Sequence, residues 1–330
     1  MTPPKSPSQI SVVNRLQQLD LRQVGLPLVV ILMIVFFTFK SDVFMTPGNF
    51  QNVGLQAAAI ACVAFGQTFV ILTAGLDLSV GATVALVSVV SAMVMNDRGP
   101  FVGIVVGLLA GVAVGLVNGL VITRLRVAPF IATLAMLSIV SGVALNLSGG
   151  TPVVGLPKSF TSLAYSRLLG IPVPLVLAIA VLILAYAVLR FTRLGRYIYS
   201  TGGNSQAARL SGINVRSTQL AAYIICAALA AIGGLILTAR VASGQPTLGS
   251  DLALTSVAAV VLGGVSLFGG RGSVLGVAVG VVFVTVLANG LNLLGVSSYT
   301  QMMVIGVAMI LAIAADEFIS RKSRTRQNPS

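Results

Sequence analysis

Stretches of roughly 20 apolar residues recur along almost the whole chain, and this pattern constrains the fold more than any other feature. Only 8% of the 330 residues are charged, against about 25% in an ordinary soluble domain. So few charged side chains cannot cover the surface of a soluble globule of this size. The sequence therefore predicts one lipid-embedded domain, without a separate soluble domain.

The apolar runs predict helices, because a helix satisfies its own backbone hydrogen bonds in the bilayer and crosses it in about 20 residues. A β-barrel would need alternating strands, which the sequence lacks. We expect an all-α integral membrane fold with about ten transmembrane helices. Eight full spans are the alternative, because three runs are short. The expected spans cover residues 24–39, 53–73, 78–95, 101–123, 128–147, 171–189, 220–239, 252–268, 273–294 and 299–315.

Lysine and arginine are distributed unevenly among the expected loops, and cytoplasmic loops of membrane proteins carry the excess of these residues. With the N-terminus inside, 15 of the 20 basic residues fall on the inner side. Both termini are therefore expected in the cytoplasm, and this topology explains the net charge of +13 better than a nucleic-acid partner does. The inner residues are Lys5, Arg15, Arg22, Arg124, Arg126, Arg190, Arg193, Arg196, Arg209, Arg216, Arg271, Arg321, Lys322, Arg324 and Arg326; the outer ones are Lys40, Arg98, Lys158, Arg167 and Arg240.

The two halves of the chain share a weak, collinear pattern. An Arg-Gly pair at 98–99 and an Asn-Gly-Leu run at 118–120 reappear at 271–272 and 289–291. Five expected spans separate the copies, so the two halves have opposite orientations in the membrane. This predicts an inverted repeat of roughly spans 2–5 and 7–10, an arrangement typical of transporters, in which the translocation route lies where the halves meet.

The sequence lacks the residues that several other functions require. It has no Gly-x-x-x-x-Gly-Lys motif for nucleotide phosphates and no histidine, and its two cysteines lie inside apolar runs. All seven acidic residues fall at span ends or in connections, which argues against coupling to an ion within the membrane. We therefore expect no catalytic residues, no metal site and no cofactor, and we do not expect an enzyme.

Neutral polar side chains remain inside the expected spans, and they suit the passage of an uncharged polar solute. Each of them alone is better explained by a hydrogen bond between helices than by a contact with the solute. Asn118 and Asn289 occupy matching places in the two halves and are our expected pair along the route. The candidate route residues are Gln56, Gln67, Asn118, Asn289 and Asn292.

Glycines recur at every fourth position of the run at 101–123 and form one stripe on the expected helix. Such small-residue stripes allow helix backbones to approach closely in a membrane. We assign this stripe to helix packing rather than to a ligand. Its members are Gly103, Gly107, Gly111, Gly115 and Gly119.

The longest inner connection, residues 190–217, is the most informative polar segment. Residues 205–210 are expected to form a short helix, with an Asn-Ser start and a Ser-Gly stop. An exposed helix of this kind can dock into a groove on a cytosolic partner, although a solvated positive loop that only fixes the topology is the alternative. A bulky acid at Ala208 is expected to disturb such docking. The candidate docking residues are Gly195, Arg196, Gly203, Asn204, Ala207, Ala208, Arg209, Leu210, Ser211 and Gly212.

From about residue 48 to 317 the chain resembles the permease subunits of the ribose-type ATP-binding-cassette sugar importers. Two pieces are distinctive: the 195–215 part of the connection 190–217, and the Gly-Leu-Asp-Leu-Ser-Val-Gly run at 75–81. One run departs from the family: many ribose-type members carry Glu-Leu-Asp-Ala where this chain has Ala-Leu-Thr-Ser at 253–256. Ribose itself is therefore in doubt. The other matching runs are 126–134, 260–270 and 289–297.

This resemblance implies a bacterial inner (plasma) membrane permease that moves a monosaccharide, either a ribose-like pentose, a hexose or a related polyol, from periplasm to cytoplasm. It implies three partners: a second permease subunit, expected as a homodimer, a cytosolic ATPase that binds the ATP, and a periplasmic sugar-binding protein. The 195–215 loop would hold the helix that couples to the ATPase. The chain would divide into a cytoplasmic segment 1–23, a permease domain 24–317 and a basic cytoplasmic tail 318–330.

Two other functions remain open from the residues alone. The first is a stand-alone secondary carrier or facilitator for a small neutral polar solute. The second is a membrane scaffold, which would need neither the distinctive loop nor the inverted repeat.

Overall fold

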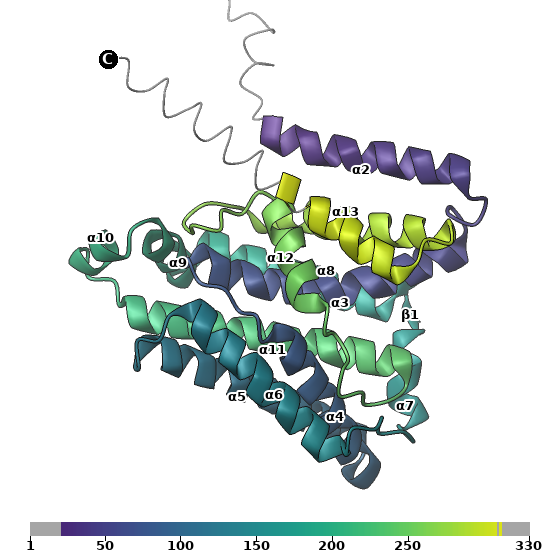
Figure 1. Cartoon of the computed structure of the whole chain (residues 1–330), viewed down its shortest axis with the longest axis horizontal. Helices are drawn as coiled ribbons and strands as arrows, with labels where there is room; N and C mark the ends of the chain where they lie inside the picture. Colours follow the sequence, from purple (N-terminus) through teal and green to yellow (C-terminus); the bar gives the residue numbers. More distant parts are fainter. Residues whose placement is uncertain (1–20, 309, 312–330) are drawn as a thin grey trace, which may run out of the picture.

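The computed structural model describes residues 21–308 and 310–311, and these residues are mostly helical (Figure 1). Seven helices in this part of the chain are long and apolar enough to cross a membrane. They are α3 (Pro47–Leu72), α4 (Val80–Arg98), α5 (Pro100–Thr123), α6 (Pro129–Ser148), α8 (Val173–Phe191), α11 (Val215–Val241) and α13 (Val274–Leu293).

The other elements are shorter or lie in the connections. Helix α2 (Leu21–Lys40) contains an apolar stretch, and α12 (Leu252–Leu262) is apolar but has only 11 residues. The remaining elements are α7 (Lys158–Thr161), the 3-10 helix η1 (Ser162–Ala164), α9 (Arg193–Gly203), α10 (Ser205–Leu210) and the antiparallel strands β1 (Arg167–Leu168) and β2 (Ile171–Pro172). Residues 298–308 are also helical.

Local sequence explains where several spans begin. Pro47, Pro100 and Pro129 stand in the first turn of α3, α5 and α6, where the missing backbone N–H of proline is not needed. Helix α6 ends at Gly149, whose φ of 61° is left-handed. Proline therefore starts these spans, and a left-handed glycine ends α6.

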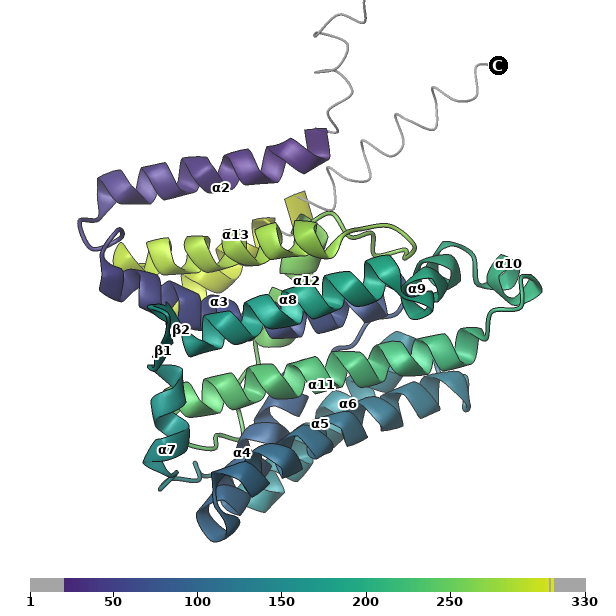
Figure 2. The same cartoon turned by 180° about the vertical axis from the view of Figure 1, so that it is seen from behind.

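Helices α3 and α11 form the centre of the bundle. Every residue of α3 from Ala58 to Leu72 is buried. Helix α11 packs against α3, α4 and α5, while α6 packs on α4 and α5. On the other side α3 contacts α8, α12 and α13, and α2 lies outermost beside α13 (Figures 1 and 2).

The glycine stripe of α5 lies against its two neighbours in the bundle. A Cβ atom at Gly107 would lie 3.0 Å from the Cβ of Ser91 in α4, and one at Gly115 would lie 2.6 Å from the Tyr223 carbonyl oxygen in α11. All five glycines of the stripe are buried. Their lack of side chains brings α5 close to both α4 and α11.

The bundle has two distinct ends. Both views show α9 and α10 at one end, here called the α10 end, with the first turn of α2 on the same side (Figures 1 and 2). Helix α7 and strand β1 lie at the opposite end, here called the α7 end. The connection 190–217, which was expected to be cytoplasmic, therefore projects from one end of the bundle as two helices.

Helix is present within each expected span, but two features of the expected pattern are wrong. The run 252–268 is not one helix, because α12 stops at Leu262 and Gly263 and Gly264 follow in an irregular connection. Helices α3 and α11 also begin earlier than residues 53 and 220. Their first turns are polar, and hydropathy marks the apolar part of a helix rather than its full extent.

The expected terminal segments fall largely outside the described residues. This applies to most of the segment 1–23, to the tail 318–330 and to the end of the last expected span, 299–315.

Candidate functional site

The connection between α8 and α11 is built by successive helix caps. The Thr192 hydroxyl accepts a hydrogen bond from the backbone N–H of Gly195 (3.2 Å) and starts α9. Asn204 ends α9 and starts α10, since its side-chain oxygen accepts from the N–H groups of Gln206 (3.0 Å) and Ala207 (2.9 Å). The short helix expected over residues 205–210 is therefore present as α10, and α9 is an addition that the sequence did not predict.

Helix α10 presents a polar surface with one apolar side chain at its end. Leu210 is 86% exposed, whereas Ala208 is only 4% exposed and faces the protein. A bulky acid at Ala208 would therefore disturb the packing of α10 within this chain rather than a contact with a partner. Of the ten candidate docking residues, Gly195 and Ala208 are buried and the other eight are exposed.

The end of α9 is wedged between two other parts of the chain. A Cβ atom at Gly202 would overlap the carbonyl oxygen of Leu72, the last residue of α3. The same carbonyl oxygen accepts a hydrogen bond from the backbone N–H of Gly270 (3.0 Å), which lies between α12 and α13. We call the contact of Leu72, Gly202 and Gly270 the inner junction; it ties the α10 end of α3, α9 and the α12–α13 connection together.

A second contact fixes α9 to the same connection. The Tyr199 hydroxyl donates a hydrogen bond to the Gly272 carbonyl oxygen (3.0 Å). Burial raises the pKa of the Tyr199 phenol above its usual value, and the positive charge of Arg190 opposes this rise. The neutral phenol therefore keeps its proton for this hydrogen bond.

A buried polar cluster lies where α3 turns into α4. Asp77 is only 1% exposed, and its carboxylate accepts hydrogen bonds from the backbone N–H (2.9 Å) and the hydroxyl (2.6 Å) of Ser79. The Asn118 amide donates to the Ser79 hydroxyl (2.8 Å) and to the Asp77 carboxylate (3.3 Å). The Gln67 amide donates to the backbone carbonyl of Asp77 (2.5 Å). We call these four residues the Asp77 cluster.

The Asp77 cluster joins two expected route residues, Gln67 and Asn118, around an acid that was expected in a connection. Asp77 does lie in a connection, but this connection folds into the bundle and buries the carboxylate. The three donors of Ser79 and Asn118 explain why a buried carboxylate is tolerated here. Its sequence position between two apolar runs gave no indication of this burial.

The other expected route residues lie apart from this cluster. Asn289 exchanges two hydrogen bonds with Asn49 near the α7 end (2.8 and 2.9 Å). Asn118 and Asn289 therefore have different partners. Gln56 is half-buried, and Asn292 is exposed.

The segment before α12 also enters the bundle. A Cβ atom at Gly81 would lie 2.5 Å from the carbonyl oxygen of Gly249, and one at Gly249 would lie 2.8 Å from Val84. The chain thus passes from the end of α11 to the first turns of α4 before the short helix α12 begins. Asp251, at the start of α12, is exposed.

Replacing Asn204 with alanine should destabilise α10, because it removes the side-chain oxygen that accepts from two backbone N–H groups. The expected cost is about 1 kcal/mol, the usual loss for a helix cap. Amide hydrogen exchange of residues 205–210 should become faster, while Asn204→Asp, which keeps an accepting oxygen, should remain close to the parent. Unchanged exchange in Asn204→Ala would show that the cap does not hold α10.

Comparisons with known proteins give a consistent assignment. The family model described as "Branched-chain amino acid transport system / permease component" matches residues 49–313. The ribose import permease protein RbsC of Bacillus subtilis (strain 168) is 42% identical over 86% of this chain and 89% of its own length. The L-arabinose transport system permease protein AraH of Escherichia coli (strain K12) is 36% identical over 86% of each chain.

A third relative is the D-allose transport system permease protein AlsC of Escherichia coli (strain K12), 34% identical over 88% of this chain and 90% of its own length. No solved structure matches the chain significantly. The family model covers most of the chain, and these relatives cover 86–88% of it. The chain is a multi-pass membrane protein of the permease family described as the branched-chain amino acid transport system permease component.

Proposed function

We propose that this chain is the membrane-spanning subunit of an ATP-binding-cassette importer that moves a monosaccharide from periplasm to cytoplasm across the bacterial inner membrane. Its relatives named above are permeases for ribose, L-arabinose and D-allose. The family description mentions branched-chain amino acids, but three relatives at 34–42% identity all act on sugars. A sugar or related polyol is therefore the substrate class.

We propose ten membrane crossings, arranged as an inverted repeat with both termini in the cytoplasm. Seven long helices, α2, α12 and the helix at 298–308 together supply ten segments. Arginines gather on α9, α10 and the first turn of α11, as the positive-inside rule requires of a cytoplasmic end. The short α12 and the preceding segment that enters the bundle support a transporter, because broken helices commonly form transporter sites.

The energy for transport comes from a separate cytosolic ATPase that docks on α10. The single observation that carries this proposal is the exposed Leu210 at the tip of a capped helix at the α10 end of the bundle. Protein interfaces commonly combine an apolar centre with a polar rim. The inner junction would then pass movements of α10 to α3 and to the α12–α13 connection. The chain itself would hydrolyse no ATP and would need no cofactor.

The remaining partners follow from the same proposal. A second copy of this chain would complete the route, and a periplasmic sugar-binding protein would deliver the solute at the α7 end. The domain division into 1–23, 24–317 and 318–330 remains part of this proposal.

Uptake in proteoliposomes tests this function. The purified chain alone should not move labelled ribose, arabinose or allose, whereas the chain with its ATPase, its binding protein and ATP should move one of them. Uptake by the chain alone would favour the stand-alone carrier. ATP-driven uptake of leucine or valine, with none of these sugars, would overturn the substrate class.

Replacing Leu210 with glutamate should weaken the binding of the ATPase at least tenfold. The substitution places a charge at the expected apolar anchor, and burying a charge without a partner costs more than the ~1.4 kcal/mol that corresponds to a tenfold loss. Leu210 has little packing within the chain, so folding should be unaffected. Co-purification of the ATPase measures the effect, and Leu210→Met, which stays apolar, is the control. Equal co-purification of Leu210→Glu and the parent would exclude α10 as the docking helix.

A further inference from the structure

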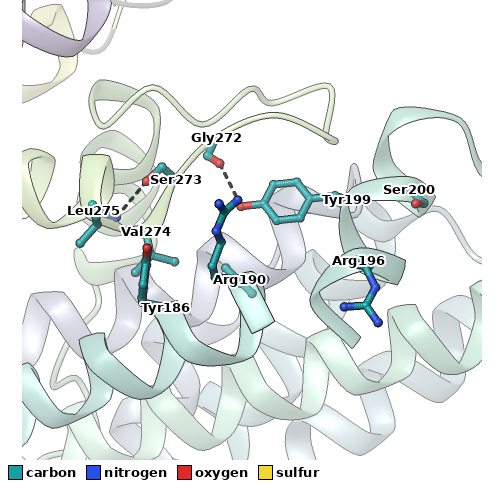
Figure 3. Close-up of a pocket in the computed structure, with 10 residues that line it drawn as sticks. Tyr186, Arg190, Arg196, Tyr199, Ser200, Gly272, Ser273, Val274 and Leu275 are labelled. Carbon is teal, nitrogen blue, oxygen red and sulfur yellow. Dashed lines mark hydrogen bonds between the residues drawn. The ribbon is translucent and has the colours of Figure 1, made fainter. Parts of the chain in front are cut away.

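A pocket of about 780 Å³ opens beside the inner junction, between α8, α9 and the start of α13 (Figure 3). Its walls combine aromatic, aliphatic and positively charged side chains. The lining residues are Tyr186, Leu189, Arg190, Arg196, Tyr199, Ser200, Gly272, Ser273, Val274 and Leu275.

The charged part of this pocket suits an anion. Arg190 lies in the last turn of α8, is exposed, and projects toward Tyr199 and Gly272 in Figure 3, whereas Arg196 points away from them. None of the four aspartates that the structure describes lines the pocket. The first turn of the 20-residue helix α13 also borders it, and the backbone N–H groups there favour negative charge.

The apolar part of the pocket lies on the exposed outer surface of the bundle. Leu275 is 52% exposed and Tyr186 is 36% exposed, each at the wall of the pocket. Along α8, Ile183 and Leu184 are each 62% exposed, and Phe191 is 70% exposed. In a membrane-spanning helix such side chains contact acyl chains, so a ligand can hold an anionic group at Arg190 and apolar chains along α8.

We propose that this pocket binds the phosphate headgroup of an anionic phospholipid in the cytoplasmic leaflet. The proposal rests on the membrane orientation given under the proposed function. Basic pockets between helices on the cytoplasmic side are suited to such headgroups. A free phosphate shares the anionic chemistry but would leave the apolar wall unused.

Such a lipid would stabilise the position of α9 against its neighbours. Arg190 ends α8, Tyr199 belongs to α9, and Gly272 and Ser273 precede α13. A headgroup at Arg190 would therefore contact all three parts that meet beside the inner junction. Anionic lipid would hold α9 in the position from which it contacts Leu72 and Gly270.

The absence of tryptophan from the sequence allows a direct test. The variant Tyr186→Trp introduces a single tryptophan that reports on lipid at the pocket wall. If this variant folds poorly, Leu275→Trp takes its place. The full chain is reconstituted in phosphatidylcholine with increasing amounts of brominated phosphatidylglycerol or brominated phosphatidylcholine, and quenching of the tryptophan is measured. Half-maximal quenching should need about fivefold less brominated phosphatidylglycerol than brominated phosphatidylcholine. This ratio corresponds to about 1 kcal/mol per arginine near anionic lipid.

The matched charge variants are Arg190→Gln in the pocket and Arg193→Gln beside it, since Arg193 is exposed but does not line the pocket. Arg190→Gln should abolish the preference for phosphatidylglycerol over phosphatidylcholine, and Arg193→Gln should retain it. Equal quenching by both lipids, or equal loss in both variants, would overturn the proposal. Relief of quenching by millimolar inorganic phosphate would also overturn it, in favour of a free phosphate site. The assay needs neither ATPase nor sugar, so its result is separate from that of the uptake test.

Discussion

Replacing Gly202 with alanine is expected to reduce ATP-driven uptake at least tenfold. The new Cβ atom would overlap the Leu72 carbonyl oxygen and would lie 2.6 Å from the Gly270 backbone nitrogen. Both atoms belong to backbone, so α9 has to move away from α3 or from the α12–α13 connection. Overpacking of this kind commonly costs about 1–3 kcal/mol. The inner junction would open, and movements of α10 would no longer reach the two helices that it joins.

The neighbouring glycine supplies the control for this substitution. A Cβ atom at Gly203 would meet nothing within 4 Å, so Gly203→Ala should cost far less uptake than Gly202→Ala. Both variants are compared in proteoliposomes with the ATPase present, with ATP hydrolysis recorded beside uptake. If Gly202→Ala transports as well as Gly203→Ala, the inner junction does not transmit the movement. Continued ATP hydrolysis without uptake in Gly202→Ala would show that docking survives while coupling is lost.

Replacing Asn118 with leucine is expected to lower the free energy of unfolding by about 3 kcal/mol. Leucine cannot donate to the Ser79 hydroxyl or to the Asp77 carboxylate, which stays buried with fewer hydrogen bonds. Leaving a buried polar group without its partner costs about 1–3 kcal/mol, and more for a charged group. Asp77→Asn in the same chain should recover part of the loss, because it removes the buried charge.

The chain carries its own probes for this measurement. Cys62 and Cys226 are free and fully buried, so a thiol-reactive fluorophore labels them only as the bundle unfolds. The melting temperature of Asn118→Leu should fall clearly below that of the parent. Asn292→Leu makes the same change at an exposed position and should melt with the parent. Identical melting of all three proteins would mean that the Asp77 cluster adds nothing to stability.

The short helix α10 could be predicted because its signals are local. Asn204 caps it and Gly212, with a φ of 81°, ends it, all within nine residues of sequence. Helix α9 escaped prediction although Thr192 caps it in the same way, because three of its 11 residues are glycines, two of them at its end. Those glycines are tolerated because the end of α9 packs on Leu72 and Gly270, which are distant in the sequence.

The expected route residues show the same division. Sequence identified Gln67, Asn118 and Asn289 as polar side chains inside apolar runs. Only the structure places Gln67 and Asn118 around Asp77, and Asn289 against Asn49. A polar residue in a span has to find a partner, but its spacing along one helix does not say which neighbouring helix provides it.

The sequence by itself determined that this chain is a helical membrane protein, where most of its spans lie and which residues form α10. Hydropathy and helix caps act over a single turn or a single span, so they can be read along the chain. The tertiary structure alone decided the burial of Asp77, the inner junction and the early end of α12. Each of these depends on which distant segments meet. A buried carboxylate is stable only where donors converge on it, and backbones approach most closely where a glycine leaves room.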